Sequence, residues 1–393
     1  SLTTWPTTSP AVFSFTTSGG LMPSSGNVLR FRTRAETTNV SPSLASAYAK
    51  AYLDAAPANE TAEVLGPLGD ADVLLSVCNL LRDQVNTSPA EISEKASRLH
   101  GWLVGTHPAV GFFDEREYFL GETALTAGAA FRLLGKRDET ERWLDRADAS
   151  FRHTLNPAAS LARVAYVRLT LRFDMRRYDD VLELLPSVSL TFQKVGMPAE
   201  LAKCHFLEAM ALKDLGRDEE AKEKLEYLAC AAEFDCENAI RGMALLNLGD
   251  LQGRAGAFEA ALASYALANP LLQSTKRYIA LADLKGMVGD TLQRMGRVDQ
   301  SLAAYRESIQ DYLSVGAQTR AAYLRVVLAQ ALLEAGRPNE AEWEIRHAIP
   351  VISTERMVPE GFAALSVLGE AVRQRKADPK ALSELREYLQ AKN

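Results

Sequence analysis

The sequence predicts an all-α protein built from stacked pairs of antiparallel helices. From about Ser41 onward, apolar residues recur at the three- to four-residue spacing of amphipathic helices. In addition, one short phrase that ends a helix, turns at a glycine and starts the next helix occurs six times at intervals of 40 or 41 residues. A fixed interval of this length is typical of repeat proteins, in which each helix pair packs only on its neighbours.

Residues 1–40 differ from the rest of the chain and form a separate N-terminal segment. They contain fifteen Ser or Thr residues, a share too high for a helical repeat. Within them, AVFSFTT (11–17) and NVLRFRTR (27–34) alternate apolar and polar residues, as β-strands do. The segment is therefore either a β-hairpin that lies against the helical body or a flexible leader, and the sequence leaves both alternatives open.

Residues 41–112 are predicted to form an N-terminal helical cap. Its three helices are expected at 41–56, 70–86 and 89–104. The last of these has a clear start, because Ser88 can cap the helix and Pro89 suits its first position.

Six corner phrases follow in residues 113–393. A glycine at the corner can take the left-handed conformation that ends a helix without steric cost, and acidic residues just after it complement the N-terminus of the next helix. The second phrase, FDMRRYDDVLEL (173–184), has no glycine and aligns on Met175. The corner positions are Gly135, Met175, Gly216, Gly256, Gly296 and Gly336.

Small and large residues recur at fixed distances from these corners. Seven residues before the corner the side chain is usually small, as at Gly249 and Gly289, and nine residues after it the side chain is large, as at Tyr265 and Tyr305. Such pairs allow two helices to approach closely while a large side chain fills the gap. The second repeat departs from this pattern, with Arg168 and Asp180 at positions where small residues are expected.

This order of small residue, glycine corner, alanine and large residue resembles the tetratricopeptide repeat (TPR), most clearly in LLNLGDLQGRAGAFEAALASYALA (245–268). The family's usual repeat has 34 residues, so the 40-residue unit resembles its longer variety. The resemblance covers about 115–350 and implies a right-handed α-solenoid. Residues 358–391 are expected to be a degenerate seventh helix pair that caps the C-terminal end.

Composition excludes several classes of function. The chain of 393 residues has a formal net charge of −6 and a pI near 5.6, which argues against a nucleic-acid partner. No apolar run approaches the roughly 20 residues needed to cross a membrane. Four cysteines without CxxC spacing favour a reducing compartment, and we expect the protein in the cytoplasm.

No catalytic or metal-binding pattern is visible, so we expect no enzyme activity, cofactor or metal. The five histidines lack partner ligands at suitable spacing, and the nucleophile, phosphate-binding and zinc motifs of common enzyme families are missing from the sequence. Acidic runs such as 218–220 lie at helix starts, where they complement the helix dipole.

The remaining candidate is the concave groove, which the first helix of each TPR pair lines. Basic residues near the end of these helices could hold an acidic or extended peptide, although Lys and Arg also favour helix ends for structural reasons. Asp250 and Asp290 can pair with Arg254 and Arg294 four residues later, which makes Arg132, Arg172 and Lys213 the better candidates. The resemblance implies that Asn247 contacts a ligand backbone or carboxylate. The predicted groove residues are Arg132, Arg172, Lys213, Asn247, Asp250, Arg254, Asp290, Arg294 and Gln330.

These observations predict a non-catalytic scaffold or regulatory adaptor that binds a protein or peptide in its groove. The alternative is the ligand- or peptide-sensing module of a bacterial signalling or transcription regulator, which would act through an attached or separate effector. The sequence does not choose between the two.

Overall fold

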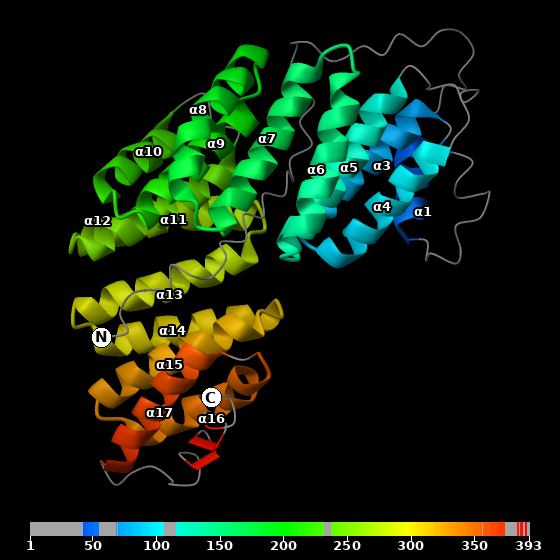
Figure 1. Ribbon diagram of the computed structural model, residues 1–393. Helices are drawn as coiled ribbons and strands as arrows, with labels where there is room; N and C mark the ends of the chain where they lie inside the picture. Colours follow the sequence, from blue (N-terminus) through cyan, green and yellow to red (C-terminus); the bar gives the residue numbers. More distant parts are fainter. Residues whose placement is uncertain are drawn as a thin grey trace. The chain divides into compact units, whose positions relative to one another are not determined.

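The computed structural model describes residues 42–54, 68, 70–105, 115–231, 237–355 and 357–373, and a few positions between 383 and 390. Over these residues the chain forms 16 α-helices and no β-strand (Figure 1). The predicted all-α fold is thereby confirmed. The question of a hairpin in 1–40 lies outside the described residues. The helices are α1 (Pro42–Asp54), α3 (Ala71–Gln84), α4 (Pro89–Gly105), α5 (Arg116–Leu133), α6 (Arg137–Arg152), α7 (Pro157–Asp174), α8 (Tyr178–Val195), α9 (Pro198–Asp214), α10 (Asp218–Cys230), α11 (Asn238–Arg254), α12 (Phe258–Ser274), α13 (Tyr278–Arg294), α14 (Val298–Ser314), α15 (Gln318–Glu334), α16 (Pro338–Thr354) and α17 (Val358–Arg373).

The described helices divide into two compact units between Arg217 and Asp218. The N-terminal unit contains α1 to α9, and its first three helices match the ranges expected from the sequence. The C-terminal unit contains α10 to α17. The predicted end of the N-terminal cap, at residue 112, falls in 106–114, outside the described residues.

Each unit is a stack of antiparallel helix pairs. In the N-terminal unit α5 pairs with α6 and α7 with α8, and in the C-terminal unit the pairs are α11 with α12, α13 with α14, and α15 with α16 (Figure 1). The first helices of neighbouring pairs also touch, as α11 touches α13 and α15 touches α17. They form an inner layer whose helices, such as α5, α11 and α15, are apolar and buried around most of their circumference. This is the arrangement of an α-solenoid.

Nine corners between helices share one geometry. At each corner a residue with positive φ donates its amide to the carbonyl three residues before it, and the next amide donates to the carbonyl five residues before it. This is the Schellman motif, which satisfies carbonyls that a helix end would leave unpaired. The residues with positive φ are Gly135, Arg176, Gly196, Gly216, Gly256, Lys276, Gly296, Gly316 and Gly336.

The alignment of the second repeat on Met175 is wrong, because the left-handed residue of that corner is Arg176, with φ of 59°. Moving the alignment by one residue removes the departures seen in the sequence. The positions five and nine residues after the corner become Val181 and Leu185, which are buried, whereas Leu184 is exposed. The glycine-free corner concealed the register because an arginine had taken the left-handed conformation.

The corners also show that the true structural period is half the predicted one. From Arg176 onward they follow at 20 residues, or at 40 where position 236 lies outside the described residues. Helices of 17 residues alternate with corners of three residues. The sequence did not reveal the corners at Gly196, Lys276 and Gly316, which join the second helix of one pair to the first helix of the next.

The predicted pairing of small and large residues is present in the packing. A Cβ atom on Gly249 would lie 2.4 Å from Cε1 of Tyr265, and one on Gly289 would lie 2.7 Å from the ring of Tyr305. Both tyrosine side chains are buried. Glycine at these positions lets an aromatic ring lie directly on the backbone of the inner helix, and it thereby sets the distance between the two helices of the pair.

Apolar cores run through both units without interruption by charged layers. One cluster joins α1, α3, α4 and α5, a second joins α5, α6 and α7, and two more fill the C-terminal unit. Asp70 caps α3 by accepting hydrogen bonds from the amides of Asp72 and Val73 at 2.9 and 3.2 Å. Among the helices of the described ranges, none combines the length and the apolar character that crossing a membrane would need.

Candidate functional site

The inner layer carries the groove residues that the sequence predicts. In the N-terminal unit Arg132 lies near the end of α5, but its guanidinium is engaged by the chain itself. Its Nη1 atom lies 2.6 Å from Oδ2 of Asp174 on α7, and its side chain is 8% exposed. Burial raises the pKa of Asp174 in spite of the neighbouring Arg132. This ion pair joins two successive inner helices, and Arg132 is therefore a structural residue first.

Arg172 and Lys213 have a different setting. Both are half-buried near the ends of α7 and α9. In the part of the chain that the structure describes, the Arg172 side chain makes no ion pair. Of the predicted cations in the N-terminal unit, Arg172 is thus the one best placed to bind a group from outside the chain.

A buried ion pair in the same unit escaped the sequence reading. The guanidinium of Arg163 on α7 donates to both carboxylate oxygens of Glu122 on α5, one of them at 3.1 Å, and Arg82 on α3 lies 3.6 Å away. Burial alone would raise the pKa of Glu122, but the two arginines hold it below its usual value. The partners are separated by 41 residues on different helices, so local sequence spacing gives no sign of this contact. Its tight burial indicates a structural role.

In the C-terminal unit the predicted cations are also used within the chain. Arg254 lies 3.8 Å from Asp250 and 3.3 Å from Asp218. Arg294 lies 3.3 Å from Asp290, and its Nη1 donates to the carbonyl of Gly253 at 3.2 Å. The i,i+4 pairs expected from the sequence are therefore present, and both guanidinium groups contact acceptors of the chain.

The two predicted amides are held by their own helices. Nδ2 of Asn247 donates to the carbonyl of Met243 at 2.9 Å, and its side chain is 7% exposed. Nε2 of Gln330 donates to Glu334 at 3.2 Å. A ligand that used either amide would have to share or replace these bonds.

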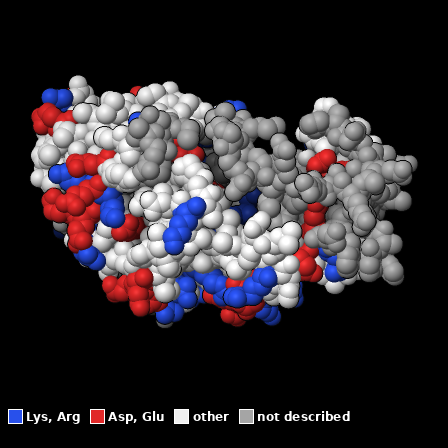
Figure 2. All heavy atoms as spheres, turned by 90° about the horizontal axis from the view of Figure 1, so that it is seen from above, with Lys and Arg blue, Asp and Glu red and all other residues white. Residues whose placement is uncertain are grey.

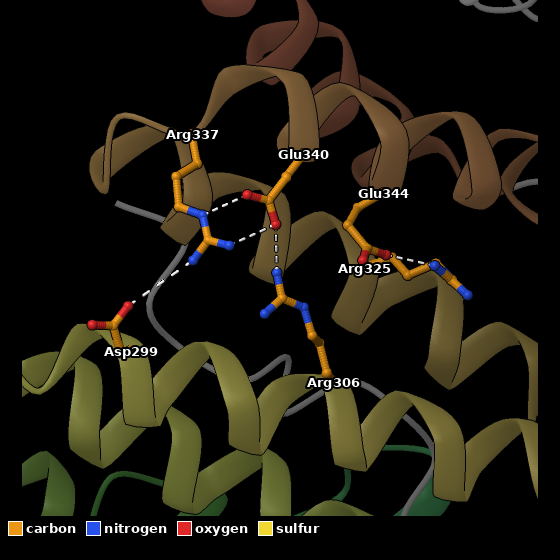
Figure 3. A network of polar contacts seen from close by, with 6 residues as sticks. All are labelled: Asp299, Arg306, Arg325, Arg337, Glu340 and Glu344. Atoms are coloured by element: carbon orange, nitrogen blue, oxygen red, sulfur yellow. Dashed lines mark hydrogen bonds and ion pairs between the residues drawn. The ribbon is translucent and has the colours of Figure 1, made fainter.

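The outer layer has an ionic network of its own (Figure 3). Glu340 on α16 accepts from Arg337 at the preceding corner and from Arg306 on α14, which ties two neighbouring pairs together. One turn further along α16, Glu344 binds Arg325 of α15. Burial raises the pKa of Glu344, which shows that Arg325 compensates its charge only in part.

Charges of both signs are interspersed on the molecular surface. On the face shown in Figure 2, groups of Lys and Arg lie beside groups of Asp and Glu, and no wide field of one sign covers it. In the described ranges no group of three or more His, Cys, Asp and Glu side chains could hold a metal ion. Cys78 and Cys204 are buried, and burial raises the pKa of both thiols, which disfavours the reactive thiolate.

Comparison with known proteins gives likeness at the level of structure. No protein-family model matches the sequence, and no curated protein sequence matches it significantly. Aspartyl phosphate phosphatase F from Bacillus subtilis superposes with a TM-score of 0.55 and 12% identity, covering 91% of this chain and 94% of that one. A Rap protein complexed with competence and sporulation factor gives 0.53 and 13%, covering 89% and 97%.

The apo form of RapI gives a TM-score of 0.50 and 11% identity, covering 70% of this chain and 96% of its own. Identities this low carry information about fold and not about activity. The three superpositions, together with the helix pairs and corners described above, show that this chain has a TPR-like helical repeat fold.

Proposed function

We propose that the chain is a non-catalytic regulatory scaffold that binds a protein segment or peptide on the inner layer of its helices. The observation that carries this proposal is the constant 20-residue spacing of helix and corner. It places half-exposed side chains at equivalent positions on successive inner helices, a regular row suited to an extended partner. The Rap protein with a similar fold that is complexed with competence and sporulation factor supports a peptide as the partner class.

Within this proposal the predicted groove residues have unequal roles. Arg172 is proposed to contact an acidic or terminal carboxylate group of the partner, with Lys213 on the next inner helix as a second contact. Arg132 acts by fixing the spacing between α5 and α7 through Asp174. The ligand-sensing alternative requires an effector in addition, attached or separate, and remains a prediction, as does a cytoplasmic location.

The test is a selection of short random peptides on the full chain, followed by measurement of the Kd of the selected peptides by fluorescence polarisation. Arg172→Glu should weaken binding of peptides that carry carboxylates. The matched control is Arg142→Glu on the second helix of a pair, where the side chain is 65% exposed and pairs only with Glu139 among the described residues. The proposal fails if no peptide is enriched, or if both variants bind every selected peptide as the parent chain does.

A further inference from the structure

The inner layer of the C-terminal unit carries a strip of half-buried apolar side chains. It consists of Met243 on α11, Met287 on α13, and Tyr323 and Val327 on α15, and we call it the apolar strip. Counted back from the corner glycines, these residues occupy the same two positions of each repeat, and those positions are four residues apart. They therefore share one face of the inner helices. Each packs on the core with one side and retains exposed surface on the other.

Two carboxylates border this strip. Asp250 and Asp290 occupy the position three residues after the strip on α11 and α13, and their side chains are 14% and 21% exposed. They lie close enough for the charge of Asp250 to raise the pKa of Asp290, which burial raises further. Glu360 on α17 acts on the pKa of Tyr323 in the same direction, which places a third carboxylate at the far end of the strip.

The nearby arginines do not turn this border positive. Arg254 shares its guanidinium between Asp250 and Asp218, and Arg294 shares its own between Asp290 and the carbonyl of Gly253. The longer of the two i,i+4 contacts is 3.8 Å, beyond the range of a good hydrogen bond. A cation supplied from outside would therefore meet partly buried carboxylates that the chain neutralises only in part.

The geometry also suits one backbone conformation. Packed helices lie about 8–10 Å apart. A peptide in the polyproline II conformation advances about 9 Å in three residues and then presents its side chain on the same side again. One apolar side chain at every third position could therefore reach each inner helix in turn.

We propose that the apolar strip binds a peptide with apolar side chains at every third position and that Asp250 and Asp290 receive a Lys or Arg of the same peptide. This inference rests on the proposed function and deepens it. It assigns the C-terminal unit a basic, apolar partner segment, whereas the cations expected from the sequence pointed to an acidic one. Half-buried carboxylates form stronger ion pairs with such a group than exposed ones do.

The experiment uses two synthetic fluorescent peptides that have the same apolar residues at every third position and differ only in carrying Lys or Glu beside them. Binding to the full chain is measured by fluorescence polarisation at low and at moderate salt. We expect the lysine peptide to bind about ten-fold more tightly than the glutamate peptide, with the preference reduced by salt. The double variant Asp250→Asn with Asp290→Asn should lose this preference and keep the binding due to the apolar side chains.

Two controls separate the possible failures. Asp299→Asn removes a carboxylate from α14 that is 98% exposed, and it should leave the preference unchanged. Circular dichroism verifies that each variant keeps its helices. A preference that survives in the double variant, equal binding of both peptides, or binding of neither overturns the inference. The proposed function fails separately, if the random-peptide selection also enriches nothing.

Discussion

Replacing Gly249 and Gly253 by alanine, one at a time, should change stability in opposite directions although both glycines lie in α11. At Gly249 the new Cβ would lie 2.4 Å from the ring of Tyr265, a separation that forces the ring or the helix to move. At Gly253 its nearest neighbours would be Oγ1 of Thr291 at 3.5 Å and Cβ of Ala261 at 3.8 Å, which are ordinary contacts. The two sites thus offer the same substitution with and without a steric conflict.

The expected magnitudes follow from two opposing contributions. Alanine is favoured over glycine in a helix interior by about 1 kcal/mol, so Gly253→Ala should raise the free energy of unfolding by about that amount. Overpacking a buried site costs about 1–3 kcal/mol, and the depth of the conflict at Gly249 places it near the upper end, for a net loss of about 2 kcal/mol. The two variants should therefore differ by about 3 kcal/mol.

The assay is urea unfolding followed by helical circular dichroism, with amide hydrogen exchange to locate the change in α11 and α12. A second variant provides a rescue. Gly249→Ala combined with Tyr265→Ile reproduces the residue pair found at the equivalent positions Ala329 and Ile345, and it should recover most of the loss. If both single variants stabilise the chain equally, close contact between ring and backbone does not set the spacing of these pairs.

Three further predictions concern other parts of the stack. Arg176→Gly should stabilise the chain by up to about 1 kcal/mol because it relieves a left-handed non-glycine residue, while Gly216→Arg should destabilise it by a similar amount; urea midpoints that move the other way would contradict this. Burial lowers the pKa of His100, so its contribution to stability is complete above about pH 6.5 and is lost as the pH falls below that value; His100→Gln should flatten the loss between about pH 7 and about pH 5. Arg325→Met leaves the buried Glu344 without its partner and should cost about 3 kcal/mol, and adding Glu344→Leu should restore most of it; a double variant as unstable as the single one would show that the ion pair itself is needed.

The sequence was informative about the fold because the corners depend on local chemistry. A glycine is needed where φ is positive, and six repeats supply enough examples to find the period. The same dependence explains the errors. Arg176 and Lys276 take the left-handed conformation without being glycine, so the second repeat was misaligned by one residue and one class of corners was not recognised.

The site was less predictable because its charges meet partners that are far away in the sequence. The i,i+4 pairs of Arg254 and Arg294 could be expected from spacing, and they are present. The partner of Arg132 is Asp174, 42 residues later on another helix, and only the stacking of helices brings the two together. The apolar strip had no sequence signal of its own, since methionine, tyrosine and valine on a helix are usually core residues.

The constant length of helix and corner limits how such a chain can grow or shrink. Two kinds of helix alternate, one facing its counterparts across the stack and one facing outward, and every 20-residue step switches from one kind to the other. A duplication of a single step would exchange the roles of all helices that follow and bury their charged surfaces. Viable length changes must therefore come in multiples of 40 residues, and each of them adds or removes one rung of the binding surface without altering the others.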